Sequence, residues 1–146
     1  MNRSSVRFAA RSTLAGLFAA SVSASCLIGC SVAPPAPDVT SGRFTGPRIE
    51  LDPYQEFHSV TLHAPQPGWT IRLDRVDDRF GYKQVYVSIR RPHPMAPVAP
   101  LDQPQRVLTS VLAQSPVEVF ARELGYDAPL DAEDAYTLAI PRADAR

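Results

Sequence analysis

Prolines and glycines divide the chain after Pro47 into short segments, and this spacing limits what the chain can form. The sequence has 146 residues, of which 15 are proline and 7 are glycine. Proline lacks the backbone N–H that the interior of a helix or sheet requires, so it favours the ends of elements. Between these breaks the apolar residues come in short runs, several of which alternate with polar residues. This pattern is typical of an all-β domain.

Two segments, residues 69–76 and 83–90, alternate most regularly and predict two strands. The apolar residues in phase are Trp69, Ile71, Leu73, Val85, Val87 and Ile89. The polar, glycine-containing stretch 77–82 predicts that the two strands form a hairpin. Residues opposite each other in an antiparallel pair point to the same face, so we expect Leu73 opposite Val85 or Val87, with Trp69 in the core.

Further strands are predicted from shorter apolar runs, and one segment is ambiguous. The further strands are 48–52, 58–63, 106–113 and 135–140. Residues 116–124 fit a short helix, with Ser115 as N-cap, Pro116 in the first turn and Gly125 after the end. They also fit a strand paired with 106–113. An isolated helix of this length is marginal, so the strand is favoured, and an α+β domain is the alternative.

About seven short strands over about 95 residues predict a small immunoglobulin-like β-sandwich, although the Cys…Trp…Cys signature of true immunoglobulin domains is missing. The run 68–91 followed by 105–122 is similar to uncharacterised domains of other small exported bacterial proteins. That resemblance implies no activity, because a fold alone does not specify one.

Residues 1–29 have the parts of an export signal. Arg3, Arg7 and Arg11 give a basic start, and residues 12–29 contain no charge. An uncharged stretch of this length approaches a transmembrane helix, but its serines and threonine make it too polar for a confident span. Another alternative is an ordinary secretory signal cut near Ala24-Ser25.

The end of this stretch, Leu27-Ile28-Gly29-Cys30, resembles the lipobox of bacterial lipoproteins. The resemblance implies cleavage before Cys30 and attachment of diacylglycerol to its sulfur, with a third acyl chain on the new amino group in many bacteria. Two or three chains hold a protein durably on a membrane, whereas one holds it marginally. Ser31 after the cysteine resembles the residue that directs lipoproteins to the outer membrane, so we expect a protein anchored there, on the periplasmic face.

The remaining chain is expected to comprise a tether at 30–47, an all-β domain at 48–141 and a tail at 142–146. Residues 31–47 are rich in proline, serine, threonine and glycine, which is typical of a linker. The alternative is that part of this stretch adds an edge strand to the domain.

Composition excludes several classes of function for the mature protein. Removing residues 1–29 takes away three of the fifteen basic residues and none of the fifteen acidic ones, which leaves a net charge near −3. A nucleic-acid-binding domain would instead show a basic excess. Cys26 leaves with the signal and Cys30 is used for lipid, so no disulfide, thiol nucleophile or cysteine metal site is expected.

No motif predicts a catalytic residue, a metal ion or a cofactor. His58 and His63 differ by five positions, so they point to opposite faces of one strand. The acidic stretch 127–134 lacks the glycine of a calcium loop, and no Gly-x-Ser-x-Gly elbow occurs. We therefore expect that the protein is not an enzyme.

Surface recognition is the class of function that is left. Arg72, Tyr86, Arg90 and Arg91 form the candidate interaction surface, because the hairpin register brings them near one another; the alternative is that the arginines pair with Asp74. The proline-rich stretch 92–104 is a second candidate, since loops on β scaffolds often bind partners. The sequence thus favours a non-enzymatic interaction or structural module that meets an envelope protein. An inhibitor or accessory subunit of an envelope protease or transport complex, and an enzyme with an unrecognised site, are the alternatives.

Overall fold

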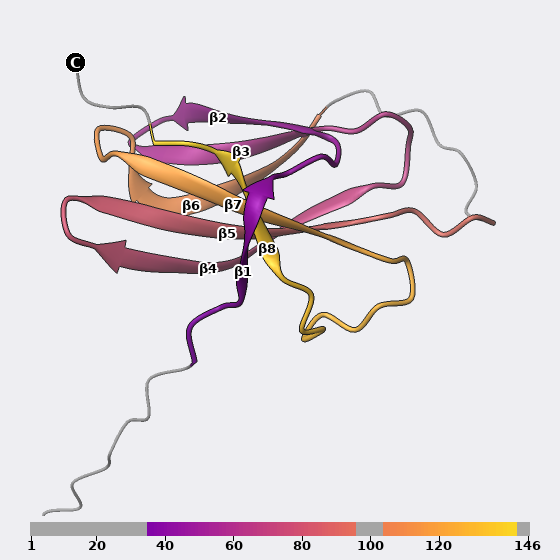
Figure 1. Ribbon diagram of the computed structural model, residues 1–146. Helices are drawn as coiled ribbons and strands as arrows, with labels where there is room; N and C mark the ends of the chain where they lie inside the picture. Colours follow the sequence, from indigo (N-terminus) through magenta and orange to yellow (C-terminus); the bar gives the residue numbers. More distant parts are fainter. Residues whose placement is uncertain (1–34, 96–103, 143–146) are drawn as a thin grey trace, which may run out of the picture. The chain divides into compact units, whose positions relative to one another are not determined.

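The structure is a computed structural model that describes residues 35–95 and 104–142, and this part contains eight β-strands and no helix (Figure 1). The strands are β1 (Val39–Arg43), β2 (Arg48–Tyr54), β3 (Phe57–His63), β4 (Thr70–Arg79), β5 (Tyr82–Arg90), β6 (Gln105–Leu112), β7 (Val117–Leu124) and β8 (Tyr136–Ile140). One sheet has five strands in the order β1-β8-β7-β5-β4, and the other has three in the order β2-β3-β6. The main hydrophobic core takes residues from both sheets. The prediction of a small all-β sandwich is confirmed.

The five-stranded sheet is mixed rather than antiparallel. β5 pairs with β7 in parallel, and so does β1 with β8, while the β4–β5 and β7–β8 pairs are antiparallel. Parallel neighbours need a crossover connection, and β6 supplies it here by lying in the other sheet between β5 and β7 in the chain. Immunoglobulin domains consist of two antiparallel sheets, so the strand pairing in this sandwich follows a different pattern.

Residues Val117–Leu124 form a strand, so the strand prediction is confirmed over the helix. The prediction that this strand pairs with 106–113 is wrong. β6 and β7 lie in different sheets, and the chain between them crosses from one sheet to the other. Pro116, just before β7, accepts a hydrogen bond from the Lys83 N–H at 2.9 Å, which begins the parallel pairing of β7 with β5. The short link therefore joins two layers and does not close a hairpin.

The β4–β5 hairpin has Leu73 opposite Val87, one of the two expected registers. A bulge between Leu73 and Arg75 then shifts the register, and the strands continue to Arg79 opposite Tyr82. The stretch 77–82 expected as the link is therefore mostly strand, and only Phe80 and Gly81 turn. Gly81 has a φ of 82°, a backbone conformation that suits glycine in a tight hairpin turn.

The centre of the main core is the inner face of β5, which faces the three-stranded sheet. Val85, Val87 and Ile89 are completely buried, as are Val60 and Leu62 on the facing strand β3. The other buried members of the core are Trp69, Val111, Val117, Val119 and Ala121. The predicted core position of Trp69 and the predicted inner faces of β4 and β5 are confirmed.

A second, smaller cluster lies on the opposite, outer face of the five-stranded sheet. Tyr86 stacks on Phe120 with ring centroids 5.3 Å apart and meets the edge of Tyr136 at 5.2 Å. A register shift in the β7–β8 pair turns Leu138 toward this cluster and Ile140 toward the main core. β5 is consequently covered on both faces.

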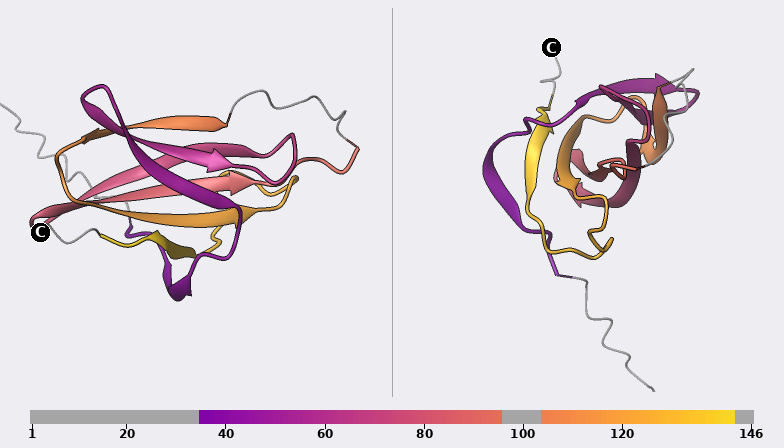
Figure 2. Two further views of the ribbon diagram at one scale, coloured as in Figure 1. Left: turned by 90° about the horizontal axis from the view of Figure 1, so that it is seen from above. Right: turned by 90° about the vertical axis from the view of Figure 1, so that its right-hand side faces the viewer.

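The N-terminal limit of the domain lies earlier than expected. β1 lies within the stretch predicted as tether and pairs with β8, and the compact unit that contains both strands begins at Pro35. The tether prediction for 30–47 is therefore wrong over its described part, where the alternative of an edge strand holds. Figure 2 shows β1 outside β8, after which the chain passes over to β2 in the other sheet. Because β1 is short and exposed, its composition resembles that of a linker.

The core assignment predicts the effect of truncating Ile89. Ile89→Ala removes a completely buried side chain and should lower the free energy of unfolding by about 2–4 kcal/mol. Thr70→Ala, at an exposed position of the same sheet, should change it by less than about 0.5 kcal/mol. Urea denaturation followed by circular dichroism measures both, and similar losses in the two variants would contradict the assignment.

Candidate functional site

The predicted interaction surface does not form as one surface. Arg72 lies opposite Ser88 on the outer face of the five-stranded sheet, and Arg90 shares that face. Tyr86 is on the same face but is only 1% exposed, so its prediction as a surface residue is wrong. Arg91 follows Arg90 directly and therefore points the other way.

Each of the three arginines has a partner within the domain, which is the alternative the sequence left open. The Arg72 Nε lies 3.4 Å from an Asp74 carboxylate oxygen. Arg90 donates a hydrogen bond of 2.7 Å to the Ala128 carbonyl, and Arg91 donates one to Glu123. The contacts of Arg90 and Arg91 hold the loop after β7 and the end of β7 against the end of β5.

Arg122 on β7 organises the outer face. Its side chain is 7% exposed, and its Nε donates a hydrogen bond of 2.7 Å to the Ser88 hydroxyl. Its other nitrogens donate to the carbonyls of Leu130, at 3.0 Å, and Ala132. The guanidinium also lies over the Tyr136 ring, 4.7 Å from its centroid. One buried cation thus fastens the 125–135 loop over the sheet.

Asp74 is the anion of this cluster. One of its carboxylate oxygens accepts hydrogen bonds from the Ser88 hydroxyl and from the Tyr136 hydroxyl, the latter at 3.0 Å, and lies 3.9 Å from Arg122. Ser88 therefore donates to a carboxylate and accepts from a guanidinium, and no histidine contacts it in the described part of the chain. This arrangement suits a structural ion pair and lacks the base that a serine nucleophile needs.

The buried hydroxyl of Tyr136 predicts a loss of stability at alkaline pH. Burial, followed by the nearby Asp74 charge, raises the pKa of Tyr136 above its ordinary value near 10. The unfolded chain therefore loses this proton at a lower pH than the folded protein. Stability is complete below about pH 10 and falls as the pH rises from there through the folded pKa.

Denaturant titrations between pH 8 and pH 11 measure this fall. Burial raises the pKa of Tyr86 as well, so the Tyr136→Phe variant should retain part of the pH dependence and lose the rest. If the free energy of unfolding of Tyr136→Phe fell with pH as steeply as that of the wild type, the assignment to Tyr136 would be contradicted.

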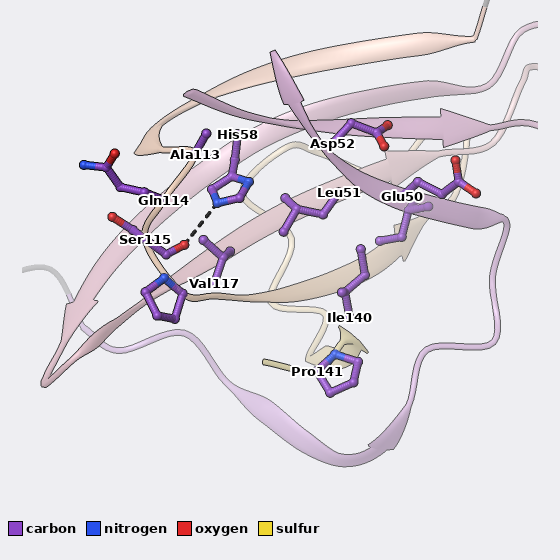
Figure 3. A pocket seen from close by; sticks show the side chains of 12 residues that line it. Glu50, Leu51, Asp52, His58, Ala113, Gln114, Ser115, Val117, Ile140 and Pro141 are labelled. Atoms are coloured by element: carbon purple, nitrogen blue, oxygen red, sulfur yellow. Dashed lines mark hydrogen bonds between the residues drawn. The ribbon is translucent and has the colours of Figure 1, made fainter. Parts of the chain in front are cut away.

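An apolar cleft of about 760 Å³ opens at one end of the sandwich, between β2 and β3 on one side and β7 and β8 on the other (Figure 3). Its apolar lining residues are Ile49, Leu51, Ala113, Pro116, Val117, Ile140 and Pro141. Glu50 and Asp52 line it as well, but both have partners elsewhere. Glu50 pairs with Arg48 and His63, and Asp52 accepts a hydrogen bond from Thr61.

His58 adds an imidazole ring to the lining of the cleft. Its Nε2 lies 3.0 Å from the Ser115 carbonyl oxygen, the bond drawn in Figure 3. Its Nδ1 is shielded from solvent and has no hydrogen-bond partner within residues 35–95 and 104–142. Because the partner of the ring is a carbonyl and not the Ser115 hydroxyl, these two residues do not form a base–nucleophile pair.

The outer face of the three-stranded sheet carries exposed apolar side chains. They are Tyr54, Phe57, Leu108 and Leu112, and we call them the apolar patch. Tyr54 lies opposite Phe57, and Phe57 lies opposite Leu112. Arg106 reaches across the sheet with its guanidinium 5.1 Å from the Tyr54 ring centroid, and Pro104 and Leu108 join these two around a shallow hollow of about 390 Å³.

Sequence reasoning missed both Arg122 and the apolar patch, although each left a signal. Arg122 shares one strand phase with Phe120 and Leu124, which indicates that its charge lies on a partly apolar face and must be paired within the domain. The segment 106–113 also has apolar residues in both phases. In a sheet with one covered face, this pattern leaves Leu108 and Leu112 on the open face.

Two predicted sites lie outside the described residues: Cys30, and most of the 92–104 stretch. Within residues 35–95 and 104–142, no helix is long and apolar enough to cross a membrane. Nor does that part of the chain bring three or more histidine, cysteine or acidic side chains together as a metal site.

Comparison with known proteins gives no relative: no protein family, no curated protein and no solved structure matches this chain.

Proposed function

We propose that the protein is an outer-membrane lipoprotein, anchored through Cys30, whose β-domain is a non-enzymatic module that binds another envelope protein through the apolar patch. The Cys30 lipobox resemblance supports the anchor and the location. The observation that supports the binding surface is the exposure of four large apolar side chains on one sheet face, with Leu108 54% exposed. Contiguous exposed apolar surface on a soluble domain is typical of interaction sites.

The neighbouring residues favour an extended protein segment as the partner. β6 ends the three-stranded sheet, so in the described part of the chain one side of its backbone has no strand partner. β4, the edge of the other sheet, carries a bulge and several charges, and β2 contains Pro53. Such features protect an edge from pairing, whereas β6 has neither proline nor glycine and carries a single charge, Arg106. A segment with apolar side chains and one acidic residue would match the patch and Arg106.

Site-specific photo-crosslinking in living cells tests the proposal. A photoreactive phenylalanine analogue at Leu112 should give a specific crosslinked band from the envelope fraction, which mass spectrometry identifies. Leu108→Arg in the same chain should reduce this band at least about five-fold, because a charge on the apolar patch must be desolvated on binding.

Thr70→Arg is the matched control, because Thr70 is exposed on the outer face of the other sheet. It should leave the band unchanged. A band that is equally strong with Leu108→Arg, or one lost equally in both variants, would reject the apolar patch as the binding surface.

A further inference from the structure

We infer that the cleft at the open end of the sandwich is a binding site for a small, neutral, apolar molecule that carries one hydrogen-bond donor, such as a hydroxyl group, and that His58 Nδ1 receives this donor. The site is separate from the apolar patch, which lies on the outer face of the three-stranded sheet. Its ligand is a small molecule and not a protein segment.

The volume and lining of the cleft suit such a ligand. Small-molecule sites measure about 300–1,000 Å³ and combine apolar walls with few polar groups, and the cleft of about 760 Å³ falls in this range. Its walls come from the inner faces of both sheets, where Ile49 and Leu51 face Val117 and Ile140. Ile49, Leu51 and Ile140 are only partly buried, so they keep apolar surface that a ligand would cover.

The hydrogen bond to Ser115 decides which group His58 offers to the cleft. A carbonyl oxygen only accepts hydrogen bonds, so the proton on the ring must be at Nε2. In the neutral ring Nδ1 is then an acceptor with a free lone pair. Within the described part of the chain no donor reaches this atom, and its surroundings exclude solvent.

A buried acceptor without a partner lowers stability, and a ligand that supplies the donor recovers this loss. For the ligand to reach Nδ1, the lining must shift, and the half-buried Leu51 is a lining residue drawn near His58 in Figure 3. The two carboxylates in the lining already have partners, so they do not require a cationic ligand. Glu50 pairs with Arg48 and His63, and Asp52 accepts a hydrogen bond from Thr61. The charge balance of the cleft therefore favours a neutral molecule.

Equilibrium dialysis with two matched probes tests the inference. 2-Naphthol has an apolar body and one hydroxyl donor, and 2-methoxynaphthalene has the same body without the donor. The full chain in lipid nanodiscs should bind 2-naphthol about five-fold more tightly than 2-methoxynaphthalene, the difference expected for one net hydrogen bond. Empty nanodiscs measure the partition of each probe into lipid.

Variants of the cleft separate the acceptor from the walls. His58→Phe keeps a ring of similar size but removes the acceptor, so the two probes should bind with equal affinity. Ala113→Trp, at the rim beside His58, should block both probes. In wild-type protein the ¹⁵N resonance of His58 Nδ1 should shift when 2-naphthol is added and stay in place with 2-methoxynaphthalene.

Three results would overturn the inference: binding of neither probe to the wild-type chain, equal binding of both, or a preference for 2-naphthol that survives His58→Phe. A thermal midpoint within a few degrees of wild type checks that each variant is folded. The Leu108→Arg variant should bind both probes normally, so failure at the cleft and failure at the apolar patch are independent results.

Discussion

Arg122→Ala should lower the free energy of unfolding by about 3–5 kcal/mol, the loss typical of removing one partner from a buried ion pair. The substitution leaves the Asp74 carboxylate without its buried cation and leaves the Leu130 and Ala132 carbonyls without their donor. Domains of this size have total stabilities of about 5–15 kcal/mol, so much of the variant would be unfolded at moderate denaturant concentrations. Denaturant titration of the purified variant measures the loss.

Arg72→Ala is the matched control, because Arg72 pairs with the same Asp74 from the surface. The Arg72 side chain is 51% exposed, against 7% for Arg122. Exposed ion pairs contribute about 0–1 kcal/mol, so Arg72→Ala should be close to wild type. Arg122→Lys keeps the charge but loses the forked geometry that reaches several acceptors. Its loss in free energy of unfolding should therefore lie between those of Arg72→Ala and Arg122→Ala. Equal losses in Arg122→Ala and Arg72→Ala would show that the burial of Arg122 does not determine its contribution.

Cys30→Ser should abolish membrane anchoring, because it removes the sulfur that would carry the diacylglycerol. The variant should no longer incorporate a fatty-acid analogue and should not be cleaved by the lipoprotein peptidase. It would accumulate as an uncut precursor or be cut elsewhere and become soluble. Metabolic labelling and fractionation of membranes measure these outcomes.

Cys26→Ser is the control for the position of the cysteine. Cys26 lies inside the expected signal without a preceding Leu-x-Gly, so this variant should be labelled and anchored like the wild type. Intact mass spectrometry of the wild-type protein should show a chain that begins at Cys30 and carries two or three acyl chains and a glycerol. An unmodified N-terminus near Ser25 would reject the anchor and, with it, the outer-membrane location.

The fold was predictable where local patterns carry the information. The alternation around Ile71 and Val87 predicted the inner faces of β4 and β5, and Leu73 is opposite Val87 as expected. The bulge after Leu73 was not predictable, because it changes the register without changing the apolar pattern before it. The parallel pairing of β5 with β7 was also missed, since it depends on β6 joining the other sheet and no local feature of 106–113 specifies that choice.

The candidate surface failed for a different reason. The alternation in β5 correctly placed Tyr86 on the face that points away from the main core. It does not indicate whether that face is exposed to solvent. Tyr86 is covered here by the rings of Phe120 and Tyr136 from the neighbouring strands, and Arg122 holds the 125–135 loop beside them. The apolar patch was missed for the converse reason. Apolar residues in both phases of a strand indicate burial on both faces, whereas β6 is covered only on its inner face.

The pairing of β1 with β8 joins the first and last strands of the domain, and this has a consequence for the order of folding. Contacts between residues far apart in sequence form slowly, because a long loop must close before they contribute any stabilisation. β8 is the last strand to leave the ribosome or an export channel, and β1 has no other strand partner in the described part of the chain. Hairpins such as β2–β3 and β4–β5 can form while the chain is still emerging. β1 can pair only after β8 has been made. The segment next to the expected anchor should therefore be the last part of the domain to become ordered. It should also be the part that a protease cuts first during folding.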